Sequence, residues 1–157
     1  METEDSSPAL DSDFPSPVKL VAAHLVVVVG VIHVSLGLYN WFRWLNAGFL
    51  VPRDLRWPLF VVSGLALIAG LFIAAQGRHR RTLYAAGIGL MIVYVVGYFS
   101  WHLGGHGFVF REPTPHQGPV GQFLLDHLFA GPVKFLAIVS EVALAVVLAY
   151  LLVKESV

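Results

Sequence analysis

Long apolar runs separated by short polar segments dominate the chain. Four of them, at about residues 20–42, 58–75, 82–103 and 132–153, are as long as a membrane-spanning helix. A hydrocarbon core about 30 Å thick needs roughly 20 residues, because each helical residue advances about 1.5 Å. We therefore predict an all-α integral membrane protein in which residues 18–157 form one domain, an up-down bundle of four transmembrane helices.

The first 17 residues have a different composition. They carry five acidic side chains, three prolines and several serines. Such a segment contains too few apolar groups to offset the entropy lost on folding. We expect residues 1–17 to form a disordered acidic tail.

Overall composition narrows the class of protein. Hydrophobic residues make up 57% of the chain and charged residues 13%, about half of the quarter that is typical of soluble domains. Ten basic and ten acidic residues cancel, so no net charge is present to attract nucleic acid. Cysteine is absent, which excludes disulfides and thiolate chemistry. No phosphate-binding loop, dinucleotide fingerprint or hydrolase motif is found, and the sequence favours a protein that is not an enzyme.

The orientation follows from the short turn between the second and third runs. Arg78, Arg80 and Arg81 lie there, and loops rich in Lys and Arg favour the cytoplasm. We expect a multi-pass protein of the cell membrane with both termini in the cytoplasm. Tyr84 and Tyr150 are expected at the cytoplasmic interface. The tryptophans all fall at the opposite interface, where their amphipathic rings are favoured: Trp41, Trp44, Trp57 and Trp101.

Two ionisable residues lie deep in the spans, where they are costly and often functional. His33 is nine residues from Phe42 in the first span, and Glu141 is nine residues from Pro132 in the fourth. The two helices run in opposite directions, so both residues should lie at one depth. A hydrogen bond between them would offset part of the cost of burial. We predict that His33 and Glu141 form a pair across the bundle.

Further polar residues follow the same helix faces. Asn40 is seven residues after His33, and Lys134 is seven before Glu141; His127 joins that stripe only if the helix continues through Pro132. Tyr94, Tyr98 and His102 share a face of the third span. Two interpretations of the stripes stay open, and the first is preferred: they only hold the helices together, or they form a proton relay, a small-ligand or quinone site, or a water-filled vestibule. The hypothetical interior site comprises His33, Asn40, Tyr94, Tyr98, Lys134 and Glu141.

Seven histidines raise the question of a metal or haem. Two histidines that bind one haem must lie at nearly the same depth on facing helices. His102 and His127 come closest to meeting this condition. His102 and His106 have a ligand spacing of four residues, but Gly104 and Gly105 are expected to end the helix between them. His116 or His127 would complete a three-histidine metal site. The alternative is that these histidines bind nothing. No cofactor is predicted, and haem or a divalent metal remains the alternative.

Small residues and one long connection complete the pattern. Gly30, Gly37 and Gly89 are expected to allow close helix packing.

The connection at about 104–125 is long, since most loops span about four to six residues. Residues 123–129 are expected to form a short amphipathic helix that serves as a lid or a docking segment.

A polar first helix, a hairpin bounded by Trp and Pro, and a Gly-rich second helix precede the other two spans. With Gly37, Pro52 and Gly64, this order resembles the small four-helix DoxX-type membrane proteins over the first two spans. No activity or site residue follows from the resemblance.

The absence of catalytic motifs sets the functional expectation. We expect a non-catalytic subunit or accessory of a larger membrane assembly, in contact with the lipid bilayer and with other membrane subunits or copies of itself. The alternatives are a redox or proton-coupled component that uses the interior site, and a small transporter.

Overall fold

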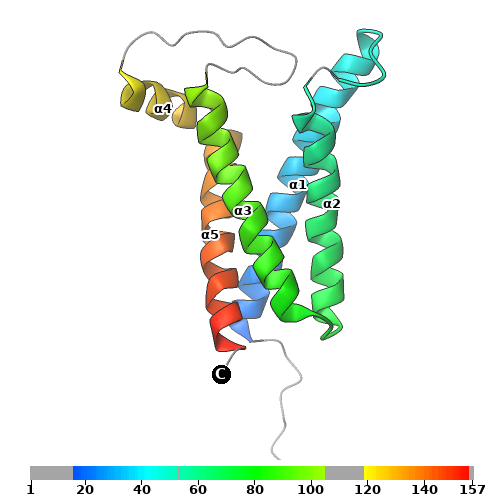
Figure 1. Ribbon diagram of the computed structural model, residues 1–157, viewed down its shortest axis with the longest axis vertical. Helices are drawn as coiled ribbons and strands as arrows, with labels where there is room; N and C mark the ends of the chain where they lie inside the picture. Colours follow the sequence, from blue (N-terminus) through cyan, green and yellow to red (C-terminus); the bar gives the residue numbers. More distant parts are fainter. Residues whose placement is uncertain (1–15, 53, 105–118, 156–157) are drawn as a thin grey trace, which may run out of the picture.

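The computed structural model describes residues 16–52, 54–104 and 119–155. Within these ranges the chain forms five helices, and each of them except α4 is long and apolar enough to cross a membrane. This confirms the predicted all-α fold with four candidate spans (Figure 1). Of the predicted tail, residues 1–15 lie outside the described part of the chain. The helices are α1 (Pro17–Asn46), α2 (Arg56–Ala75), α3 (Arg80–Leu103), α4 (Val120–Phe129) and α5 (Pro132–Lys154).

The helix ends agree with the predicted spans except in α1. This helix begins at Pro17, a residue favoured in the first turn because it has no N–H to leave unpaired. It continues to Asn46, four residues past the predicted end near Phe42. Its 30 residues extend about 45 Å, which exceeds a hydrocarbon core of about 30 Å. Helix α1 therefore extends beyond the span that the sequence indicated.

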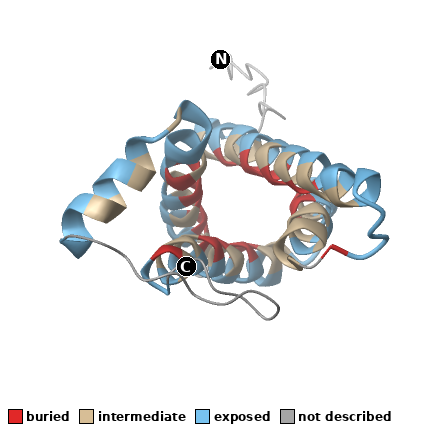
Figure 2. Ribbon diagram, turned by 90° about the horizontal axis from the view of Figure 1, so that it is seen from above, coloured by how far each residue is buried: buried red, intermediate tan, exposed pale blue. Residues whose placement is uncertain are grey.

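The four long helices surround a common interior, with their buried residues facing inward (Figure 2). Helix α2 packs mainly on α1, α3 packs on α5, and α1 packs on α5. By contrast, α2 and α3 make few contacts with each other. The bundle is thus two tightly packed helix pairs with an open seam between α2 and α3.

Glycines explain why α2 lies so close to α1. A Cβ added to Gly64 would lie 2.8 Å from the carbonyl oxygen of Gly30, and one on Gly37 would lie 2.6 Å from that of Trp57. The two backbones touch where no side chain intervenes. The expected packing role of Gly30 and Gly37 is confirmed. For Gly89 it is wrong, because nothing lies within 4 Å of a Cβ added there.

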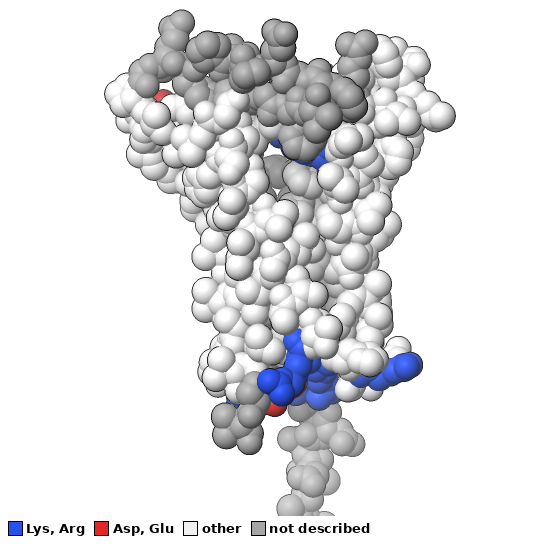
Figure 3. All heavy atoms as spheres, viewed as in Figure 1, with Lys and Arg blue, Asp and Glu red and all other residues white. Residues whose placement is uncertain are grey.

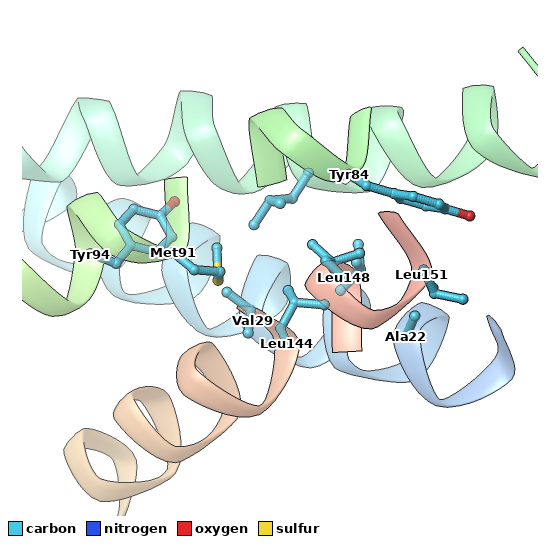
Figure 4. Close-up of a cluster of buried hydrophobic side chains, with 10 residues drawn as sticks. Ala22, Val29, Tyr84, Met91, Tyr94, Leu144, Leu148 and Leu151 are labelled. Atoms are coloured by element: carbon cyan, nitrogen blue, oxygen red, sulfur yellow. The ribbon is translucent and has the colours of Figure 1, made fainter. Parts of the chain in front are cut away.

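The half of the bundle remote from α4 contains the apolar core, and Figure 4 shows its buried side chains in close-up. Val29, Met91 and Leu144 are fully buried, and Leu148 and Leu151 continue the cluster. Tyr84 belongs to this core with 8% exposure, so its ring faces the bundle and not the lipid, although its hydroxyl donates to Glu155 near the end of the bundle. Tyr150 is 52% exposed. The core lies to one side of His33 and Glu141 along the bundle.

Helix α4 is separate from α5. Gly131 is extended, and Pro132 opens α5. His127 therefore does not belong to one continuous helix with Lys134 and Glu141, which was one of the two outcomes left open by the sequence. The expected short helix at 123–129 is confirmed as part of α4, and α3 ends at Leu103, directly before Gly104.

Candidate functional site

A cavity of about 1100 Å³, called the large cavity below, lies between α1, α2, α3 and α5 in the half of the bundle that carries α4. Most of its lining is apolar or aromatic. Each residue of the hypothetical interior site lines this cavity, although the residues come from three different helices. They are His33, Asn40, Tyr94, Tyr98, Lys134 and Glu141.

The predicted contact between His33 and Glu141 is present. The imidazole Nε2 of His33 lies 3.3 Å from Oε1 of Glu141. Their side chains are 5% and 4% exposed, respectively, so the contact is shielded from solvent and lipid. This pair marks the deep end of the large cavity, next to the apolar core that begins at Val29 and Leu144.

A backbone contact fixes the tautomer of His33. Its Nδ1–H donates a hydrogen bond to the carbonyl oxygen of Val29 at 2.9 Å. With the proton of neutral imidazole on Nδ1, Nε2 can only accept. A hydrogen bond to Glu141 therefore requires one further proton. That proton is either on the carboxyl, which then donates to Nε2, or on Nε2, which then donates to a carboxylate. Both forms of the pair have zero net charge.

Aromatic rings hold the imidazole in place. The ring of Tyr94 stacks on His33, with centroids 3.8 Å apart and planes 7° apart. Phe60 meets His33 edge to face at 4.9 Å. The hydroxyl of Tyr94 donates to Oγ of Ser63 at 2.5 Å, which ties α3 to α2 across the open seam. The histidine is therefore held from three sides and turned toward Glu141.

Two residues that line the large cavity each carry a buried polar atom with no hydrogen-bond partner among the described residues. These atoms are Oε2 of Glu141 and the hydroxyl of Tyr98. Tyr98 lies one helical turn beyond Tyr94, about 6 Å nearer the α4 end. Buried polar groups are usually hydrogen-bonded, and an exception calls for an explanation. Here both exceptions belong to residues that line the same cavity.

The remaining members of the interior site lie nearer the α4 end. Lys134 is seven residues before Glu141 on α5, about 10 Å away along the helix. It is exposed and lines the cavity. The amide of Asn40 donates to its own helix, at the carbonyl oxygen of Leu36. Neither residue forms a hydrogen bond or an ion pair with His33 or Glu141, so the structure brings them to the cavity and not to the pair itself.

The large cavity opens sideways between α2 and α3. Leu59 and Val62 of α2 and Val93 of α3 line it, yet they are 59%, 65% and 64% exposed. In a membrane-spanning bundle, apolar side chains at this level face lipid. Near one end of the opening, the guanidinium of Arg56 lies 3.3 Å from the ring centroid of Trp101 and donates to Asp54.

The histidines considered for a metal or haem are only partly described. His106 and His116 lie outside the described residues. The rings of His102 and His127 contact each other with centroids 4.9 Å apart, whereas two haem ligands face each other across the iron. Both rings use Nδ1 to donate to backbone carbonyls. The described residues include no group of three or more potential ligands that could hold a metal.

Sequence reasoning missed several residues that shape the site. Phe60 and Ser63 on α2 contact His33 and Tyr94, respectively, yet neither was among the residues predicted for the interior site. A hydroxyl among apolar neighbours, facing a span rich in tyrosine, was the available signal for Ser63. Phe60 carried none, because an aromatic residue is ordinary in an apolar helix.

No family model, curated protein or solved structure matches this chain. Its function is therefore argued from the large cavity and the groups that line it.

Proposed function

We propose that this multi-pass membrane protein binds a small lipophilic molecule of the quinone type in the large cavity and exchanges a proton with it through His33 and Glu141. This proposal develops the proton-coupled alternative that the sequence left open. The ligand class is a ring that bears carbonyl or hydroxyl groups, because such a ring suits aromatic walls and supplies hydrogen-bonding oxygens.

The observation that carries the proposal is the pair of buried polar atoms without partners, Oε2 of Glu141 and the hydroxyl of Tyr98. Each buried polar group left unsatisfied costs about 1–3 kcal/mol. A ligand oxygen within reach would remove that cost. A hydroxyl donates and accepts, and a carboxyl oxygen accepts, so the two atoms suit a ligand with both carbonyl and hydroxyl forms.

The His33–Glu141 pair supports proton exchange because a carboxyl has two oxygens. In one form, Oε1 of Glu141 carries the proton and donates it to Nε2 of His33. A ligand hydroxyl that donates to Oε2 can transfer its proton there as the Oε1 proton moves to Nε2. The ligand then carries one negative charge, Glu141 stays neutral and His33 becomes imidazolium. Charge and protons balance, and the new cation faces the new anion through the carboxyl group.

The sideways opening supports a ligand that arrives from the membrane. Apolar residues of α2 and α3 line the cavity and are more than half exposed, among them Val62 and Val93. A lipophilic ring reaching the cavity by this path would pass between apolar side chains, beside the hydrogen bond from Tyr94 to Ser63. Lys134, which lines the cavity nearer the α4 end, would attract an anionic form of the ligand.

Menadione and methylnaphthalene give a matched test, because the second has the same fused ring without the carbonyls. Trp57 and Trp101 line the cavity, so quenching of tryptophan fluorescence in nanodiscs reports binding. Menadione should bind the more tightly. Tyr98→Phe should weaken menadione binding about fivefold, the value of one hydrogen bond of about 1 kcal/mol, and leave methylnaphthalene unaffected. Equal affinities for the two probes would contradict the proposal.

The accessory-subunit function stays a second proposal, supported by a different feature. Helix α4 projects from the bundle (Figure 1), and none of its residues is buried. Phe129 and Leu125 are 65% and 52% exposed, and such a face suits a membrane partner or the interface itself. The small-transporter alternative has one supporting feature, the break between α4 and α5 at Gly131 and Pro132.

A further inference from the structure

A second cavity, of about 610 Å³, lies at the other end of the open seam between α2 and α3. It is called the small cavity below. Small residues from three helices form much of its wall, because they leave space that larger side chains would fill. They include Ala22 and Ala23 of α1, Ala66, Gly70 and Ala74 of α2, and Gly87 of α3.

The seam opens the small cavity toward the lipid-facing side. Ala66 and Ala75 of α2 and Ala86 of α3 line it and are also exposed. Gly64 holds α2 against α1, and Gly87 lets α3 approach Leu148 of α5, so neither helix pair closes the gap. The result is an apolar slot that begins near the helix ends and runs inward between α2 and α3.

Basic side chains surround the end of this slot. Figure 3 shows Lys and Arg gathered at the end of the bundle remote from α4. Lys19 and Arg80 line the small cavity, and Arg78 and Arg81 are exposed beside it in the chain. Among the described residues, the carboxylate of Glu155 offsets part of this positive charge, because it forms an ion pair with Lys19 at 3.3 Å. The described side chains at this end of the bundle therefore carry an excess of positive charge.

Arg80 is positioned for an anion. Its Nε–H donates to the carbonyl oxygen of Ala74 at 3.0 Å, which orients the guanidinium while leaving its two terminal amino groups for other acceptors. Among the described residues, no carboxylate forms an ion pair with Arg80. A guanidinium in this state suits a phosphate, which it can bind through two parallel hydrogen bonds.

We infer that the small cavity binds one anionic phospholipid, with an acyl chain in the slot and the phosphate on Arg80 and Lys19. The apolar wall excludes a purely polar anion from the slot, and the excess of cations favours an anionic headgroup over a zwitterionic one. This lipid site does not include His33 or Glu141, and its lining shares only Leu90 with that of the large cavity. It therefore stands whether or not the large cavity binds a quinone.

Native mass spectrometry of the full chain tests this site with two probes, phosphatidylglycerol and phosphatidylcholine with identical acyl chains. One phosphatidylglycerol should be retained in preference to phosphatidylcholine. Arg80→Gln should lower the retention of phosphatidylglycerol about tenfold, the value of one charge-assisted hydrogen bond to the phosphate of about 1.5 kcal/mol. The matched control Arg81→Gln, whose exposed side chain lies outside the cavity lining, should leave retention close to the wild-type value.

A second pair of variants tests the slot itself. Ala66→Phe fills the small cavity, whereas Ala69→Phe places the same side chain on an exposed position of α2 outside the lining. Lipid retention should be lost in the first variant and kept in the second. Equal retention of the two phospholipids by the wild type, equal effects of Arg80→Gln and Arg81→Gln, or full retention by Ala66→Phe would each overturn the inference.

Discussion

The imidazole of His33 and the carboxyl of Glu141 meet at 3.3 Å, between the apolar core on one side and the large cavity on the other. The backbone bond from His33 to Val29 leaves only Nε2 to face the carboxyl. The pair must therefore share one proton to form its hydrogen bond. Because Oε2 of Glu141 has no hydrogen-bond partner among the described residues, the proposed function uses this carboxyl to link the buried histidine to a ligand.

Two substitutions of Glu141 should differ in stability. Glu141→Gln keeps a donor for Nε2 of His33, because an amide N–H can replace the carboxyl proton. Glu141→Leu leaves Nε2 buried with nothing to accept from, which costs about 1–3 kcal/mol. Thermal unfolding in a fixed detergent should therefore give a lower midpoint for Glu141→Leu than for Glu141→Gln. Indistinguishable midpoints would mean that the hydrogen bond is absent.

Close contact between α1 and α2 predicts a sharp difference between two glycines. Gly64→Ala would place a Cβ 2.8 Å from the carbonyl oxygen of Gly30, and overpacking of this kind costs about 1–3 kcal/mol. Gly89→Ala meets open space and removes the helix penalty of glycine. Unfolding measurements should find the first variant destabilised and the second unchanged or stabilised. Destabilisation of both to the same extent would contradict the α1–α2 contact.

The absence of cysteine makes the predicted orientation simple to measure. Gln76→Cys lies in the turn between α2 and α3, and Ala47→Cys lies at the opposite end of α1; both positions are exposed. With both termini in the cytoplasm, a membrane-impermeant maleimide added to intact cells should label Cys at position 47 and spare position 76. The reverse labelling pattern would place the arginine-rich turn outside.

The expectation of an accessory subunit has its own measurement. After gentle solubilisation, the protein should comigrate with other polypeptides on a native gel. Substitution of the exposed Phe129 and Leu125 by Ser should release it if α4 is the docking segment, because these side chains present apolar area for a partner. Migration only as a monomer or as copies of itself would contradict the subunit proposal.

The sequence was informative where a physical constraint acted on single residues. Span length and hydropathy predicted the helices, and the cost of an intramembrane charge drew attention to His33 and Glu141. Opposite helix directions were enough to place them at one depth. The stacking of Tyr94 on His33 could not be predicted in this way, because it depends on how α3 is rotated and packed against α1.

Other features depended on the packing of helix pairs. The seam between α2 and α3 exists because Gly64 lets α2 settle on α1 and because Gly87 lets α3 settle on α5. Glycine spacing indicates close packing but not which helix is the partner, so neither cavity could be foreseen. Tyr84 is a similar case. Its position along α3 was evident from the sequence, but the direction of its side chain, toward the interior of the bundle, was not.

The central claim, that Glu141 exchanges a proton with a ligand in the large cavity, is tested most directly by infrared difference spectroscopy of the anaerobic binding of menadiol, the reduced form of menadione, whose hydroxyl can donate to Oε2. Binding to the wild type should perturb the C=O stretch of a carboxylic acid, and this signal should disappear in Glu141→Gln, which still binds menadiol. A wild-type spectrum without a carboxyl signal, or the same signal in Glu141→Gln, would contradict the account.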